Sequence, residues 1–257
     1  MNTFLLPVVT HEQHYESLLS EVELFLPAVR AICKSHNLSY QTLQKFAHGS
    51  CLAFGIDQRF VIKLMPPFWQ QEVWREILIL ECLENQAHLP TARVHYTGEI
   101  ETWFYFIMDY LPGTPCHEVW SELSVAKQCQ LLKKIGQLMV QLHHVSTEDL
   151  LNLSVDWSQF VKQQQAIFAN NQRKYGLTED WIEVLEDYLK QNIPDLPTQF
   201  KPALMHCEIM PEHLLISKKQ GEWEITGLFD FGDSMVGYPA YEFGSVCIFF
   251  TAHRPDL

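Results

Sequence analysis

Two short segments in the last quarter of the chain bring together acidic and imidazole side chains. The first, LMHCEIMPEHLLIS (204–217), carries Glu208 and His213 in a short loop before an apolar strand. The second, GLFDFGDSMVGYPAYEF (227–243), places Asp230 at the end of a returning strand. A hairpin between them would bring the side chains of Glu208, His213 and Asp230 together at the opening of one site. A divalent metal and a proton-accepting base require such a cluster.

A lysine within an apolar strand is the second chemical feature. Lys63 ends the run FVIK inside RFVIKL (59–64), where a buried ammonium without a negative partner would be costly. The helix expected over 69–85 supplies Glu72 and Glu76, one turn apart on the same face. A strand lysine paired with a helix glutamate is how kinase-like folds place a lysine on nucleotide phosphates. A surface lysine with solvated glutamates is the alternative interpretation.

The segment HGSCLAFGI (48–56) comes just before the lysine strand. In it, Gly49 and Ser50 are expected to form a tight turn whose backbone N–H groups face phosphates. The segment matches GxGxxG poorly and contains no Walker lysine. An ordinary hairpin turn is therefore the alternative at this position.

The elements that position these residues begin with a helical segment. Apolar residues at helix spacing predict it over 15–35, where Pro27 would kink or break the helix. Asp57-Gln58 separates two apolar runs and predicts a hairpin. Apolar positions at a spacing of three to four residues predict the helix that carries the two glutamates. The expected strands are 52–56, 59–64, 94–100 and 103–110.

The rest of the chain is expected to be mostly helical. LPGTP (111–115) ends the strand pattern, because it holds two prolines and a glycine. Helices are expected to begin near Ser124, Asp156 and Thr178. A β-hairpin over 214–230 interrupts them.

Length and composition fit two lobes. The chain has 257 residues, of which 47% are hydrophobic, enough to bury a sizeable core. The prediction is an α+β fold with a small antiparallel-sheet lobe over 1–110 and a larger helical lobe over 111–257.

Charge and cysteine content exclude several classes of function. Lys and Arg number 18 against 31 Asp and Glu, for a net charge of −13, which argues against a nucleic-acid or anionic-membrane binder. The same charge is compatible with a cationic substrate, although solubility alone would also explain it. Seven cysteines without a CxxC pair, no long apolar run and no signal peptide at the start predict a cytoplasmic protein.

Taken together, these motifs resemble those of aminoglycoside and related phosphotransferases, in the protein-kinase-like superfamily. The segment 204–217 resembles the HxDxxxxN catalytic loop, and residues 230–232 match the DFG element. The continuation DFGDSMVGYPAYEF is similar to IDFGDAxxGDPxYDLA, and MVQLH (139–143) is similar to the LxxLH element. The resemblance covers about residues 40–250 and implies a bilobal protein-kinase-like fold.

The resemblance also implies roles for single residues. Lys63 would contact the α- and β-phosphates, held by Glu76 or, as second choice, Glu72. Glu208 would take the position of the catalytic base, and His206 would have a structural role in the catalytic set. His213 and Asp230 would take the metal-ligand positions. The remaining expected nucleotide contacts are Gly49 and Ser50, with Met108, Asp109, Tyr110 and Leu111 as a hinge whose backbone meets the adenine.

Three departures from the family pattern bear on activity. Glu208 stands where the family usually has Asp, and a carboxylate misplaced by about 1 Å can cost on the order of 100-fold in rate. His213 replaces the usual Asn, and imidazole favours transition metals over magnesium. The chain also stops 27 residues after Asp230, where relatives continue with helices that shape the acceptor pocket, so we expect a truncated chain or an open pocket.

The expected function is that of a small-molecule kinase. It would use ATP or GTP with Mg²⁺ or Mn²⁺ and transfer the γ-phosphoryl group to a hydroxyl of a small, aminoglycoside-like acceptor. No nucleic-acid or membrane partner is expected. One alternative is a nucleotide-binding pseudokinase with a regulatory role, motivated by Glu208. Another is a kinase that acts on a protein or a lipid head group.

Overall fold

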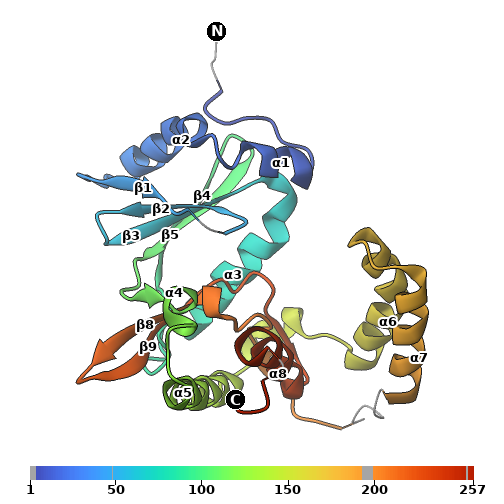
Figure 1. Ribbon diagram of the computed structural model, residues 1–257. Coiled ribbons are helices and arrows are strands. Elements are labelled where there is room, and N and C mark those ends of the chain that lie inside the picture. Colours follow the sequence, from blue (N-terminus) through green and yellow to red (C-terminus); the bar gives the residue numbers. More distant parts are fainter. Residues whose placement is uncertain (1–3, 48, 193–198, 253) are drawn as a thin grey trace.

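The computed structural model describes residues 4–47, 49–192, 199–252 and 254–257. An antiparallel sheet with three helices forms one end of the molecule, and mostly helical elements form the other (Figure 1). This is the α+β arrangement that the sequence predicts. The boundary between residues 110 and 111 stays a prediction.

The sheet has five strands in the order β1-β2-β3-β5-β4, all paired antiparallel. The hairpin turn between β2 and β3 is at Asp57-Gln58, as predicted, with φ of 50° and 53°. Positive φ at both turn residues matches the right-handed twist of the strands they join. Lys63 lies on the central strand, in register with Ala53 and Phe106. The strands are β1 (Leu43–Lys45), β2 (Leu52–Ile56), β3 (Phe60–Met65), β4 (Val94–Ile100) and β5 (Trp103–Asp109).

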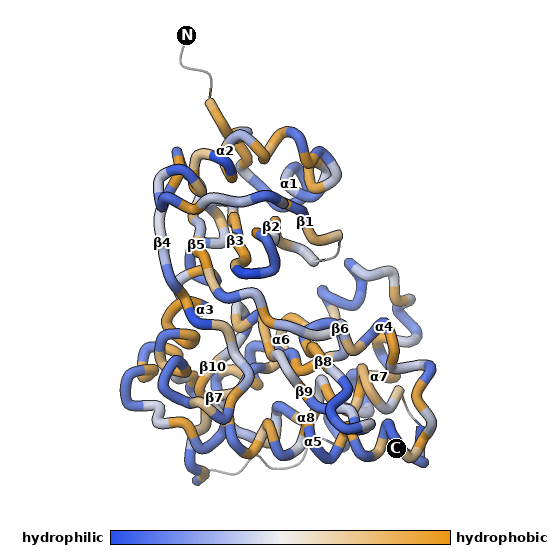
Figure 2. Tube along the Cα trace, turned by 90° about the vertical axis from the view of Figure 1, so that its left-hand side faces the viewer, coloured by the Kyte–Doolittle hydropathy of each residue, from blue (hydrophilic) through white to orange (hydrophobic). Residues whose placement is uncertain are grey.

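Helices cover both faces of this sheet. α1 (Glu12–Leu18) and α2 (Val22–Ser35) lie over one face, and α3 (Gln70–Leu83) lies on the other side, as the two views agree (Figures 1 and 2). Strand residues alternate between the faces, and most of those that β2 and β3 turn toward α1 and α2 are fully buried. These residues are Leu52, Phe54, Ile56, Ile62 and Leu64.

The N-terminal segment differs from the single helix expected over 15–35. Two helices form, divided at residues 19–21, and Pro27 lies inside α2. α2 buries Phe25 and Val29 against the sheet. Because apolar burial on one face stabilises a helix more than propensity does, packing keeps Pro27 within the helix.

The other end of the molecule is built around α5 (Val125–His143), which buries Leu131, Ile135, Leu138 and Leu142 at helix spacing. The predicted hairpin over 214–230 is present as β8 and β9. α6 and α7 lie side by side at the edge of the molecule (Figure 1). The further elements are β6 (Thr114–Pro115), α4 (Cys116–Trp120), α6 (Trp157–Lys174), α7 (Glu179–Asn192), β7 (Ala203–Met205), β8 (Leu214–Lys219), β9 (Glu222–Leu228), β10 (Met235–Gly237) and α8 (Phe243–Val246).

Short single-turn elements complete the chain. They are 3-10 turns at Pro67–Trp69, Glu148–Leu153, Pro211–His213 and Pro239–Glu242, and a π-helical turn at Cys247–Thr251. Among the residues that the structure describes, no helix is long and apolar enough to cross a membrane.

Candidate active site

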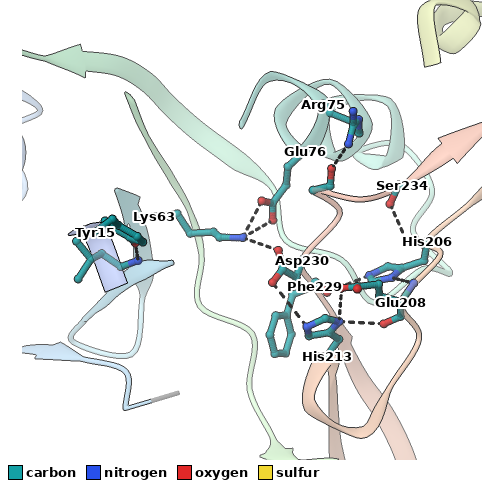
Figure 3. Close-up of polar contacts among 12 residues, drawn as sticks. Tyr15, Lys63, Arg75, Glu76, His206, Glu208, His213, Phe229, Asp230 and Ser234 are labelled. Carbon is teal, nitrogen blue, oxygen red and sulfur yellow. Dashed lines mark hydrogen bonds and ion pairs between the residues drawn. The ribbon is translucent and has the colours of Figure 1, made fainter. Parts of the chain in front are cut away.

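Lys63 is held by two carboxylates from different elements. Its Nζ donates to Glu76 Oε1 and Oε2 of α3, at 3.0 and 2.7 Å, and to Asp230 Oδ1, at 3.0 Å (Figure 3). The side chains of Lys63 and Glu76 are 5% and 1% exposed. The predicted pairing with Glu76 is therefore confirmed. Glu72, the second choice, lies beside Gly232 instead.

Lys63 and Asp230 hold each other in the ionised form, whereas burial raises the pKa of Glu76. Burial alone would lower the pKa of Lys63, but Asp230 and the other negative neighbours raise it well above its usual value. The Lys63 ammonium in turn lowers the pKa of Asp230 to about 2. The position of Lys63 is fixed mainly by Glu76, because losing that contact would leave the buried Glu76 carboxylate without its cation.

The catalytic loop places its imidazole beside Asp230. His213 Nδ1 lies 2.9 Å from the carbonyl oxygen of Glu208, and Nε2 lies 3.7 Å from Asp230 Oδ2. A carbonyl oxygen only accepts hydrogen bonds, so Nδ1 carries a proton, and Nε2 is the ring nitrogen that faces the Asp230 carboxylate. The predicted convergence of Glu208, His213 and Asp230 is confirmed (Figure 3).

Glu208 is the exposed member of the cluster. Its side chain is 46% exposed, and Oε2 lies 4.0 Å from His213 Nδ1. Partial burial and then the neighbouring Asp233 raise the pKa of Glu208. The result is a carboxylate at the mouth of the site that is more basic than a fully solvated one.

His206 joins the catalytic loop to the returning strand. Its Nε2 lies 3.0 Å from the Phe229 carbonyl oxygen, and the N–H of Glu208 donates to its Nδ1 at 3.3 Å. Burial lowers the pKa of His206 to about 4, so the ring is neutral near pH 7. One nitrogen donates and the other accepts, as a neutral imidazole can. These contacts hold the ring in place, and the structural role expected for His206 stays a prediction.

Two further residues position the site without having been assigned a role from the sequence. Buried Glu242 accepts the N–H of His206 and of Cys207, each at 2.8 Å, and Cys207 has a φ of 71°. Arg75 of α3 donates to the carbonyl oxygen of Gly232 at 2.5 Å. The sequence could have pointed to Glu242, because this acidic residue directly precedes the largely apolar run FGSVCIFF (243–250). No comparable signal marks Arg75, because helix-surface arginines are common.

The expected nucleotide contacts fall on two segments beside Lys63. Gly49 has a φ of +110°, a conformation that favours glycine, and the turn leads directly into β2. In the expected hinge, the N–H groups of Asp109 and Tyr110 already donate, to Arg93 O at 3.0 Å and to Arg59 O at 2.9 Å. A purine would therefore have to use other backbone groups of Met108–Leu111.

The expected metal ligands fit a nucleotide-bound divalent ion. Within the described part of the chain, no group of three or more His, Cys, Asp or Glu side chains is arranged to hold a metal ion. Asp230 Oδ2 and His213 Nε2 nevertheless face each other at 3.7 Å. Mg²⁺ in nucleotide sites is commonly bound by one or two carboxylates, with phosphate oxygens and water completing its shell. Asp230 would supply such a carboxylate, and His213 would supply a nitrogen ligand that suits a transition metal such as Mn²⁺ better.

A match to a family model shows which family the chain belongs to. The model of the phosphotransferase enzyme family, abbreviated APH, matches residues 52–257, which include Lys63, Glu208, His213 and Asp230. The chain belongs to this family. The resemblance noted in the sequence is thereby confirmed for the larger part of the chain.

Solved structures of family members share the fold. The GDP and kanamycin complex of APH(2")-IIia aligns with a TM-score of 0.72 at 17% identity, covering 84% of this chain and 75% of that one. The streptomycin–ATP–APH(2")-IIa ternary complex gives a TM-score of 0.58 at 18% identity, covering 92% and 77%. APH(3'')-Id from Streptomyces rimosus gives 0.64 at 12% identity, covering 90% and 84%. The chain therefore has the bilobal kinase-like fold.

Proposed function

We propose that this protein is a small-molecule kinase that transfers the γ-phosphoryl group of ATP or GTP to a hydroxyl group. The observation that carries the proposal is the position of Glu208, at the exposed mouth of a site whose inner end holds Lys63 and Asp230. Family membership and the GDP and ATP complexes of similar structures support nucleotide binding.

Each residue would act at a different part of the reaction. Lys63 would bind and orient the phosphates, since its ammonium stays charged in its buried position. Glu208 would orient the acceptor hydroxyl and take its proton as the oxygen attacks phosphorus. His206 and Glu242 would hold the loop that carries Glu208. A divalent ion on His213 and Asp230 would neutralise charge on the phosphates.

The acceptor belongs to this proposal too. The acidic chain and the kanamycin and streptomycin complexes of similar structures favour a cationic, aminoglycoside-like acceptor. We also propose Mg²⁺ or Mn²⁺ as the ion and the cytoplasm as the location. A regulatory nucleotide-binding protein is the competing hypothesis, which the experiment below separates.

Thermal unfolding with ATP or GTP, with and without Mg²⁺ or Mn²⁺, tests nucleotide binding first. A ligand that binds only the folded state raises the midpoint, by about 2.7 kcal/mol of stability at 100 times Kd. Asp230→Asn should abolish the metal-dependent part of the rise. Phosphoryl transfer to a panel of aminoglycosides and other polyols then tests the reaction. A wild-type protein that binds no nucleotide contradicts the proposal, and binding without transfer supports the regulatory alternative.

A further inference from the structure

Tyr15 on α1 is buried at the edge of the lysine site. Its side chain is fully buried, and its hydroxyl accepts a hydrogen bond of 3.1 Å from the backbone N–H of Leu52 (Figure 3). Leu52 begins β2 and directly follows the Gly49–Cys51 turn, which is expected to face the nucleotide phosphates. A side chain from the N-terminal helix thus holds the end of that turn.

The same ring contacts the start of the helix that carries Glu76. Tyr15 meets the ring of Trp69 edge-on, with centroids 5.0 Å apart and planes at 76°. Trp69 directly precedes the first residue of α3. Tyr15 therefore lies between two elements that approach Lys63 separately: the Gly49–Cys51 turn through its hydroxyl, and α3 through its ring.

The groups around the Tyr15 hydroxyl keep it protonated and hold it in place near Lys63. Burial raises the pKa of Tyr15, so the phenol stays protonated. Its hydroxyl is within electrostatic range of the Cys51 thiol and the Lys63 ammonium. Edge-on aromatic contacts add to the area that the ring buries and restrict its rotation. The hydroxyl is therefore a fixed point to which the turn is tied.

We propose that Tyr15 is a positioning residue for the nucleotide, which fixes the Gly49–Cys51 turn relative to α3 without touching the nucleotide itself. The inference rests on the proposed function. It extends the nucleotide site to an N-terminal helix that precedes the segment 52–257 matched by the family. A turn tied in its bound position loses less entropy when phosphates arrive, so the bond should appear as nucleotide affinity.

The experiment compares Tyr15→Phe with Tyr105→Phe. Tyr105 belongs to the same apolar core, is 7% exposed, and has its hydroxyl 2.9 Å from His36 Nε2. Each variant removes one buried hydroxyl from this core and keeps the ring. Only Tyr15 contacts the strand end next to the Gly49–Cys51 turn.

We expect Tyr15→Phe to raise the Kd for Mg·ATP and Mg·GTP about 5-fold, the effect of one lost hydrogen bond. In nucleotide hydrolysis, KM should rise by the same factor, while kcat stays within about twofold. Tyr105→Phe should lower the thermal midpoint comparably and leave Kd within about twofold of wild type. Titration by calorimetry and steady-state kinetics measure both.

Two results overturn the inference while the proposed function stands. One is wild-type nucleotide affinity in Tyr15→Phe. The other is an equal loss of nucleotide affinity in both variants, which would reflect reduced stability of the whole N-terminal lobe rather than an effect at the Gly49–Cys51 turn. A wild-type protein without nucleotide affinity would end the inference together with the proposed function.

Discussion

The candidate active site has an inner end at Lys63 and an outer end at Glu208. The two ends differ in burial and in how tightly their side chains are held. At the inner end, Lys63 and Glu76 are almost fully buried, and each makes bonds near 3 Å to a charged partner. At the outer end, the Glu208 side chain is 46% exposed, and its Oε2 lies 4.0 Å from His213 Nδ1. Buried ion pairs need fixed geometry to offset desolvation, whereas an exposed carboxylate can adjust. The end proposed to bind the nucleotide is therefore preorganised, and the end proposed to bind the acceptor is left adjustable.

Removing the lysine should give the largest effect. Lys63→Met leaves Glu76 buried without its cation, and should lower the free energy of unfolding by about 3 kcal/mol. Turnover with any accepted substrate should fall roughly 10²–10³-fold, as when one charge-stabilising group is lost. Chemical denaturation and kinetics measure the two effects.

The matched control for that variant is Lys127→Met. Lys127 pairs with Glu222 at 2.8 Å, but their side chains are 34% and 52% exposed. Surface pairs contribute up to about 1 kcal/mol, so this variant should stay near wild type. Equal destabilisation by the two substitutions would remove the contrast between the buried and exposed ends.

Substitution of the outer carboxylate should affect turnover alone. Glu208→Gln keeps the size of the side chain but cannot accept a proton, so kcat should fall about 100-fold. The Kd for nucleotide should stay within about twofold, because Glu208 does not contact Lys63. Glu212→Gln, an exposed neighbour in the same loop, should leave both values unchanged. A matching loss of nucleotide affinity in Glu208→Gln would place this residue at the nucleotide end instead.

Glu208→Asp sharpens the same comparison. If the longer side chain is matched to the bound acceptor, shortening it moves the carboxylate by about one bond and lowers kcat. A higher kcat in Glu208→Asp would show that the glutamate is a departure from the working geometry.

The two ends should also respond differently to acid. The pKa of Glu208 is raised above 4.5, so kcat should fall about tenfold for each unit of pH below that raised value, as the base becomes protonated. The pKa of Asp230 is lowered from 3.8 to about 2, so its stabilising effect is complete above pH 3.8 and is lost as pH falls toward 2. As the pH falls, turnover should therefore be lost before Asp230 becomes protonated.

The pH dependence of kcat and of thermal unfolding tests this order. The residual activity of Glu208→Gln should lack the acidic fall that wild type shows. An unchanged acidic limb in that variant would assign the titration to another group.

The smallest effect should come from the imidazole between the two ends. His213→Asn replaces a softer nitrogen ligand by an amide oxygen, which should shift the ratio of Mn²⁺- to Mg²⁺-supported turnover several-fold toward Mg²⁺. His144→Asn, at the C-terminal end of α5, is the control. An unchanged ratio would mean that His213 does not bind the ion.

Local patterns in the sequence predicted the parts of this molecule that depend on near neighbours. The turn at Asp57-Gln58, the helix with Glu76 and the hairpin over 214–230 all follow from spacing and turn chemistry. Lys63–Glu76 was predictable because a lysine inside an apolar strand requires a partner.

Contacts between distant segments were less accessible. Tyr15 reaches Leu52 across 37 residues, and Glu242 reaches His206 across 36. Nothing in the spacing of either pair fixes such a contact, because packing of whole elements brings them together. The division between α1 and α2 was missed for the same reason, since the break lies where the chain turns over the sheet.

The helices α1 and α2, which cover one face of the sheet, lie outside the segment that the family model matches. The segment matched by the family model begins at Leu52, yet β2 and β3 bury Phe54, Ile56 and Ile62 in the same apolar cluster as residues of α1 and α2. A fragment cut at the start of the shared segment would expose Phe54, Ile56 and Ile62 to water, and such a surface aggregates. The segment that the family model matches is thus shorter than the segment that buries this face of the sheet, and we expect soluble expression to need the residues before Leu52.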